Sequence, residues 1–223
     1  ITDRFGKVHG IVCDVTDRAG MDAAFDEIAA HQGGIDVVFA NAGVDAGPGF
    51  LTPEGRRNPE GEIDNLDDAH WDKVIGVNLT SIYYTMKLGA RHMKRQGRGG
   101  SIIATSSIAA FYADGIVGTP YMPAKAGVSH LVKQLAMELG RYKIRVNAIC
   151  PGYVETELTD AAIERITARS GRSADEASAA MTSLNPMGRM IRPDEITSAA
   201  LWLASEGASS VNGETIAISG GQA

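Results

Sequence analysis

The stretch IDVVFANAG at residues 35–43 joins a near-continuous apolar run to a turn of small residues. An apolar run of this kind is typical of a parallel strand that is covered on both faces. Comparable runs rich in β-branched residues predict further strands. They lie at residues 8–15 (VHGIVCDV), 101–105 (SIIAT), 144–149 (IRVNAI) and 214–219 (ETIAIS).

Longer helical stretches separate these runs. Apolar residues at helical spacing predict helices at 18–30, 67–96, 120–142 and 193–205, with one or two shorter ones within 155–185. Repeated strand–helix–strand units predict an α/β fold. We expect a single domain over 1–223, a Rossmann-like doubly wound parallel sheet with helices on both faces.

Residues 45–65 interrupt this alternation with four Gly and three Pro. Such a composition predicts an exposed loop, and because strand–helix alternation resumes after it, it is not a domain linker. Its Arg56 and Arg57 either face an acidic substrate or are simply solvated.

Composition limits the classes of function. A chain of 223 residues can bury about 70% of its unfolded surface, so it needs no metal or disulfide to fold. With 21 Lys and Arg against 27 Asp and Glu the net charge is -6, which argues against a nucleic-acid partner. The two cysteines, Cys13 and Cys150, lie in apolar runs and predict buried, reduced thiols rather than a disulfide. With no run of 18 apolar residues and no apolar leader, we expect a cytoplasmic protein without a membrane span.

Tyr121 and Lys125 are four residues apart near a predicted helix start, hence on one face. A phenol with a pKa near 10 is a poor base at neutral pH, and a neighbouring ammonium stabilises its phenolate. The spacing alone is equally that of a helix-surface pair. However, Ser106 and Ser107 end a strand 14 to 15 residues earlier, at the edge where open α/β sheets bind ligands.

Three other motifs accompany these residues. The small residues of Asn41-Ala42-Gly43 follow a strand and would let a ligand approach the backbone. Asn78 lies inside a predicted helix, where Asn is unfavourable without a partner. Pro151-Gly152-Tyr-Val-Glu-Thr156 follows another strand. Taken singly, the two strand-end motifs are also ordinary turns.

Together these motifs resemble the short-chain dehydrogenase/reductase family, in an order and spacing that extend over residues 8–221. The resemblance includes Cys-Asp14-Val15 near the start and NGETIAISGG at residues 212–221. It implies an oxidoreductase that uses NAD or NADP to interconvert a secondary alcohol and a ketone. The implied partner is a small-molecule substrate, and no metal is implied.

The resemblance also implies a catalytic tetrad. Tyr121 would act as general acid in carbonyl reduction and as general base in alcohol oxidation. Lys125 would lower the pKa of Tyr121 and hold the nicotinamide ribose. Ser107 would bind the substrate oxygen, and Asn78 would anchor a water that links Lys125 to solvent. The spacing favours Ser107 over Ser106, which is then structural.

The implied cofactor contacts follow three strands. They are Asp14 and Val15 at the adenine, Asn41, Ala42 and Gly43 near the adenosine ribose, and Pro151, Gly152, Val154 and Thr156 at the carboxamide and pyrophosphate.

By the same resemblance, residues 157–190 form a lid over the substrate. Its apolar residues either line a pocket or belong to the core. They are Leu158, Ile163, Ile166, Met181, Leu184, Met187 and Met190. We expect a homotetramer, with a dimer as the second choice, formed by the helices at 67–96 and 121–142.

A sheet that binds a dinucleotide opens with a strand, a Gly-rich turn and a helix. No G-x-G-x-x-G precedes the run at residues 8–15. We therefore expect the first strand–helix–strand unit, with the residue that selects NAD or NADP, to lie outside this sequence.

Two other functions are open to the same residues. A non-catalytic nucleotide-sensing or scaffold protein could use the fold, although it has no need of Ser107, Tyr121 and Lys125 together. A hydrolase could use Lys125 to activate Ser107, but no motif for an oxyanion hole is apparent.

Overall fold

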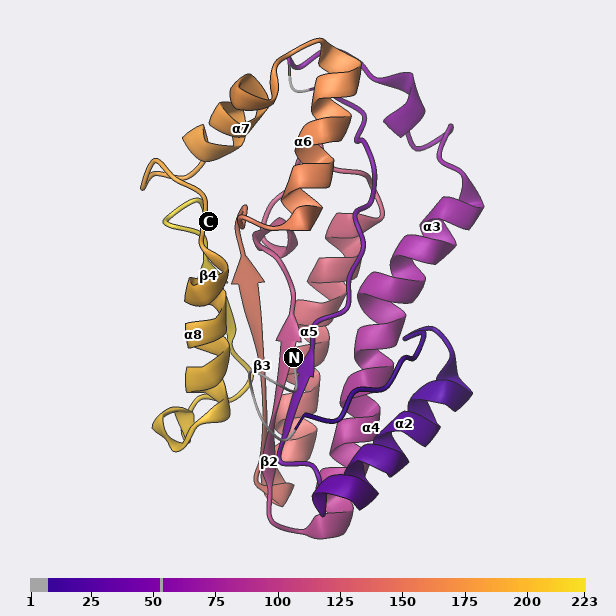
Figure 1. Ribbon diagram of the computed structural model, residues 1–223, viewed down its shortest axis with the longest axis vertical. Coiled ribbons are helices and arrows are strands. Elements are labelled where there is room, and N and C mark those ends of the chain that lie inside the picture. The colour runs from indigo at the N-terminus through magenta and orange to yellow at the C-terminus, as the bar shows by residue number, and fades with distance from the viewer. Residues whose placement is uncertain (1–7, 53) are drawn as a thin grey trace.

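The computed structural model describes residues 8–52 and 54–223. Within them four strands form one parallel sheet in the order β1-β2-β3-β4 (Figure 1). These are β1 (Val37–Ala40), β2 (Gly100–Thr105), β3 (Ile144–Pro151) and β4 (Thr215–Ile218). Four of the five predicted strands are thus confirmed, with shifted ends.

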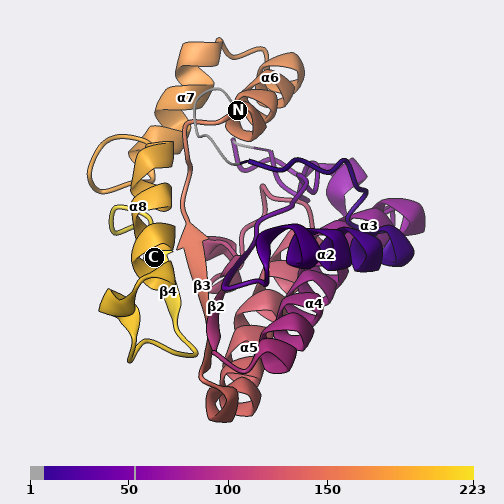
Figure 2. The same ribbon diagram turned by 60° about the horizontal axis from the view of Figure 1, so that its bottom comes forward.

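Helices cover both faces of the sheet (Figures 1 and 2). On one face lie α2 (Arg18–Gln32), α4 (Ser81–Gln96) and α5 (Tyr121–Leu139), and on the other lies α8 (Pro193–Ala204). The side chains of β2 alternate accordingly. Ile102 packs into the core beneath α4 and α5, whereas Ile103 packs against Leu203 of α8. The predicted doubly wound architecture is confirmed.

The predicted helix at 67–96 forms as α3 (Asp68–Ile75) and α4, joined by a π-helical turn at Gly76–Thr80. Asp67 caps α3, and Gly97 ends α4 with a positive φ of 70°. After β3 come α6 (Glu157–Ser170) and α7 (Ala174–Ser183).

The strand predicted at residues 8–15 is wrong. Residues 8–14 carry no regular structure, and the Val12 side chain is fully exposed. A strand requires a neighbouring strand with which its backbone can pair. In the described part of the chain, none of the four strands lies beside residues 8–15 to pair with them. The composition of the segment alone therefore does not make it a strand.

Residues 45–52 and 54–65 are largely irregular, as predicted, but hydrogen bonds and an ion pair fix their position. The Leu51 N–H donates to the Gly115 carbonyl at 2.7 Å, which joins the loop to the segment after β2. Arg57 pairs with Glu62 inside the loop, while Arg56 is exposed. The loop therefore lies beside the carboxyl end of β2.

No helix in the described part of the chain is long and apolar enough to cross a membrane. Both cysteines are free thiols. Cys150 is fully buried, as predicted, but Cys13 is only half-buried, because its segment is not covered as a strand would be.

Candidate active site

The carboxyl ends of β1, β2 and β3 lie side by side, so the motifs that follow them meet at one edge. In register, Ala40 of β1 pairs with Ala104 of β2. One residue further on, the Thr105 hydroxyl donates to Asn41 Oδ1 at 2.8 Å. The exit turns of β1 and β2 are thus bonded directly to each other.

Ser107 and Tyr121 face each other at this edge. Ser107 caps a 3₁₀ turn, Ile108–Ala110, by accepting from the Ala109 N–H at 3.1 Å. Tyr121 begins α5 directly after Pro120. Burial raises the pKa of Tyr121 above its ordinary value, and hydrogen bonding to the Ser107 side chain opposes that rise.

Lys125 lies one turn further along α5 and is only 3% exposed. Its ammonium donates to the Thr105 carbonyl at 3.0 Å and lies over the Tyr121 ring, 5.5 Å from its centre. Burial lowers the pKa of Lys125 to about 8. The raised pKa of Tyr121 is opposite to the direction expected from a neighbouring ammonium, because burial of the phenol is the largest influence on it.

Asn78 occupies the π-helical turn and is fully buried. Its Oδ1 accepts from the Val44 N–H at 3.2 Å, and its Nδ2 donates to the Val44 carbonyl at 3.0 Å and to the Val74 carbonyl at 3.1 Å. This partner explains why an Asn is tolerated inside the helix. A Cβ on Gly43 would lie 3.1 Å from Asn78 Oδ1 and 3.8 Å from Lys125 Nζ. The absence of a side chain at Gly43 therefore lets Asn78 and Lys125 lie close to the backbone after β1.

A second group of polar residues surrounds Asp14. Its Oδ1 accepts from both the N–H and the hydroxyl of Thr16 at 2.8 Å, and these bonds lower the pKa of Asp14. A cavity of about 380 Å³ opens beside it. The lining residues are Asp14, Thr16, Asp72, Lys73, Gly76 and Val77.

Of these six residues, only Asp14 belongs to a motif that the sequence predicts to bind a ligand. Thr16 could have been found from its position two residues after an Asp, which is the spacing of an Asx turn. Nothing in the sequence marks Asp72, Lys73, Gly76 or Val77 as neighbours of Asp14, since their proximity depends on how α3 packs.

The segment after β3 leads into a larger cavity. The Gly152 N–H donates to the Ile218 carbonyl at 3.0 Å, and Val154 pairs with Ile191. Thr156 then precedes α6 and lines the cavity, which has a volume of about 690 Å³. Its other lining residues include Ile163 of α6 and Arg189.

The apolar residues of 157–190 divide between the two expectations. Met181 is buried and belongs to the core, and Met190 is buried and also lines the larger cavity, whereas Leu158, Leu184 and Met187 are exposed. Ile163 lines the larger cavity, and Ile166 is half-buried.

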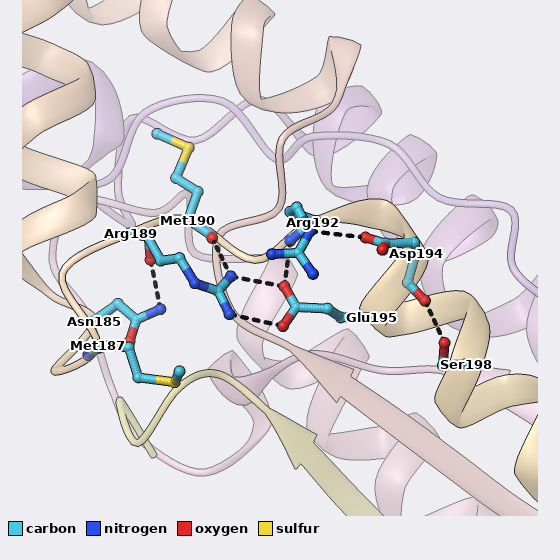
Figure 3. A network of polar contacts seen from close by, with 8 residues as sticks. All are labelled: Asn185, Met187, Arg189, Met190, Arg192, Asp194, Glu195 and Ser198. Atoms are coloured by element: carbon cyan, nitrogen blue, oxygen red, sulfur yellow. Dashed lines mark hydrogen bonds and ion pairs between the residues drawn. The ribbon is translucent and has the colours of Figure 1, made fainter.

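Figure 3 shows how this segment is fixed where it runs into α8. The Arg189 guanidinium donates to both carboxylate oxygens of Glu195, at 2.7 and 2.8 Å. Glu195 also accepts from the Arg192 N–H at 2.8 Å, and the two arginines hold its pKa at about 2. Asn185 Nδ2 donates to the Arg189 carbonyl at 2.6 Å.

Two ion pairs fix the other side of the segment. Arg165 of α6 pairs with Asp45, and Arg172 after α6 pairs with Glu54 at 3.0 Å. Both acids belong to the loop that follows β1, beside which α6 runs in Figure 1. Because α6 follows β3, the two ion pairs join the segment after β3 to the loop after β1. Strand β2 lies between these two strands, and Ser107 follows its carboxyl end.

Comparison with known proteins supports one assignment. The family model described as enoyl-(acyl carrier protein) reductase matches residues 1–223. Cis-4-hydroxycyclohexanecarboxylate dehydrogenase of Sinomonas cyclohexanicum is 36% identical over 212 residues, which are 93% of this chain and 74% of that protein. L-rhamnose 1-dehydrogenase (NAD(P)(+)) of Azotobacter vinelandii is 34% identical over 208 residues, 92% of this chain and 72% of the relative. The crystal structure of levodione reductase superimposes with a TM-score of 0.85 at 29% identity, covering 99% of this chain and 79% of the other.

Proposed function

This chain belongs to the short-chain dehydrogenase/reductase family, and we propose that it interconverts a secondary alcohol and a ketone with Tyr121 as general acid and base. As a member of that family it is an NAD(P)-dependent oxidoreductase acting on an alcohol or ketone substrate. The observation that carries the proposal is the juxtaposition of the Tyr121 phenol, the Ser107 hydroxyl and the Lys125 ammonium at one strand end.

The residues present fit a dinucleotide. An ammonium has three N–H donors, and within the described residues one of those of Lys125 is used, by Thr105. The others are available to the hydroxyls of a ribose. The cavity of about 380 Å³ beside Asp14 leaves room for other parts of the dinucleotide. When bound, NAD or NADP supplies or accepts the hydride.

Tyr121 and Ser107 act on the substrate oxygen. Because burial raises its pKa, Tyr121 is protonated at neutral pH and can donate that proton to the oxygen of a ketone under reduction. In alcohol oxidation the same side chain acts as the phenolate and accepts the proton of the alcohol. Ser107 donates a hydrogen bond to this oxygen and orients it.

Lys125 and Asn78 support the proton transfer. Lys125 holds the nicotinamide ribose and passes protons between Tyr121 and a water. The Asn78 side chain is already bonded to Val44 and Val74, so a backbone carbonyl of the π-helical turn would hold that water.

The other contacts follow from the family pattern. Asp14 accepts from the adenine amino group next to Val15, and Asn41, Ala42 and Gly43 adjoin the adenosine ribose. Pro151, Gly152, Val154 and Thr156 hold the carboxamide and pyrophosphate. Residues 157–190 form the substrate lid.

We further propose a cytoplasmic homotetramer that packs through α3, α4 and α5.

Two contacts disfavour a Ser–Lys hydrolase. Such an enzyme needs the Lys125 amine at the Ser107 hydroxyl, whereas the ammonium donates to the Thr105 carbonyl and Ser107 Oγ accepts from Ala109.

Replacement of the phenol tests the proposal. Tyr121→Phe should lower turnover by about 10²–10⁴-fold or more while fold and nucleotide affinity remain, because only the phenolic hydroxyl with its transferable proton is lost and the ring is kept. NADH and NADPH oxidation would be followed with ketones related to the substrates named for the two relatives, with Tyr142→Phe as the matched control. Undiminished turnover in Tyr121→Phe would refute the role of this residue. Nucleotide binding with no turnover by the unmodified chain would favour the sensor or scaffold protein.

A further inference from the structure

Ser106 precedes Ser107, and its side chain is directed at α5. It is 2% exposed, and its N–H donates to the Ile149 carbonyl at 2.8 Å, which continues the bonding of β2 to β3. Its Oγ lies 2.8 Å from the carbonyl oxygen of Lys125 and 2.9 Å from the hydroxyl of Ser129. Ser106 is therefore bonded to two residues of the helix that carries Tyr121.

The donors in this cluster can be assigned. A carbonyl only accepts, so Ser106 donates its single hydroxyl proton to Lys125, and Ser129 must donate to Ser106 Oγ. Lys125 and Ser129 are one helical turn apart, so Ser106 bonds to a single turn of α5. The Cys150 thiol adjoins the same two hydroxyls, and burial raises its pKa.

Consecutive residues at the end of β2 thus hold Lys125 at both of its ends. Thr105 accepts from the ammonium, and Ser106 donates to the main-chain carbonyl. The next residue, Ser107, faces Tyr121. A shift of α5 along β2 would break all of these contacts together.

We propose that Ser106, assisted by Ser129, is a positioning residue. It fixes the position of α5 along β2 and so places Lys125 and Tyr121 opposite Ser107. The predicted effect of Ser106 on turnover rests on the proposed function. The predicted effect on the position of Lys125 does not, and the experiment measures the two effects separately.

Ser106→Ala is compared with Ser101→Ala. Ser101 is an equally buried serine of β2 whose hydroxyl donates to a main-chain carbonyl at 3.0 Å, but that carbonyl belongs to Leu203 of α8. The titration of Lys125 is followed by NMR of ¹³C-labelled lysine, assigned with Lys125→Met. The pH profile of kcat is measured alongside.

In the unmodified chain and in Ser101→Ala, the pKa of Lys125 should stay near 8. In Ser106→Ala it should move up by about 0.5 unit or more towards the value of an exposed lysine, because the ammonium gains access to solvent. We expect kcat to fall by about tenfold and the midpoint of its pH profile to move, whereas Ser101→Ala changes neither.

Equal behaviour of Ser106→Ala and Ser101→Ala in both measurements would overturn the proposal. If the unmodified chain turns over no alcohol or ketone, the proposed function fails and the Lys125 titration alone decides the placement. If Ser106→Ala does not fold, Ser129→Ala decides, since it removes the donor to Ser106 Oγ. A smaller shift of the Lys125 titration supports the proposal, and an unchanged titration refutes it.

Discussion

The Lys125 ammonium lies over the face of the Tyr121 ring, 5.5 Å from its centre. The two groups are one turn apart in α5, and burial dominates the pKa of both. Burial raises the pKa of the phenol and lowers that of the ammonium to about 8, so it favours the uncharged form of each. Burial of Lys125 therefore reduces the stability of the fold wherever its ammonium stays charged.

Lys125→Met should therefore be more stable than the unmodified chain at pH 7, by up to about 3 kcal/mol. A base whose pKa is lower in the folded state destabilises the fold while it is charged in both states, below pH 8. That penalty disappears as the pH rises from about 8 to 10.5, so the unmodified chain should gain stability over this window and Lys125→Met should not. Urea unfolding at several pH values measures both effects. Lys94→Met, which removes a lysine paired with Glu138 at the surface, should show no such gain.

The direction of the reaction should depend on the protonation of Tyr121. Its raised pKa keeps the phenol protonated through neutral pH. We expect kcat/KM for alcohol oxidation, which needs the phenolate, to rise with pH beyond 8, and carbonyl reduction to hold steady or fall over the same range. Initial rates from pH 6 to 10 in both directions test this. An oxidation rate that levels off below pH 7 would contradict it.

Asn78→Ala should destabilise the chain by about 2 kcal/mol, since it leaves the buried Val74 carbonyl and the half-buried backbone N–H and carbonyl of Val44 without this partner. Chemical denaturation gives the change in unfolding free energy. The control is Asn41→Ala, because Asn41 is exposed and bonds to the Thr105 hydroxyl, so its loss should matter less. Equal effects of the two substitutions would show that the contact with Val44 contributes little.

The ion pairs of Asp45 with Arg165 and of Glu54 with Arg172 should restrain α6. Pairs this exposed contribute about 0–1 kcal/mol each. In the double variant Asp45→Asn, Glu54→Gln, the amide hydrogens of α6 should therefore exchange with solvent a few-fold faster. A loss of about 1.4 kcal/mol corresponds to a roughly tenfold change in the equilibrium for local opening. Glu62→Gln is the matched control, because Glu62 pairs with Arg57 inside the same loop. Unchanged exchange in α6 would mean that the two pairs do not hold it.

Local patterns in the sequence determined much of the fold. The apolar run at residues 35–40 and the apolar stripe of α5 predict a strand and a helix from the chemistry of neighbouring positions alone. The same holds for Tyr121 and Lys125, whose spacing puts them on one face of a helix in any fold. Four parallel strands with helices on both faces follow from such local signals.

Only the tertiary structure decided which distant groups meet. Asn78 bonds to Val44 across 34 residues, and Arg165 to Asp45 across 120. Ser106 and Ser107 are adjacent serines, yet one is bonded beneath α5 and the other faces Tyr121. The strand expected at residues 8–15 failed for the same reason, since a strand forms only where another strand is in place to pair with it. Periodicity is a property of neighbouring residues, whereas partners, burial and the pKa values that follow from burial depend on how the whole chain packs.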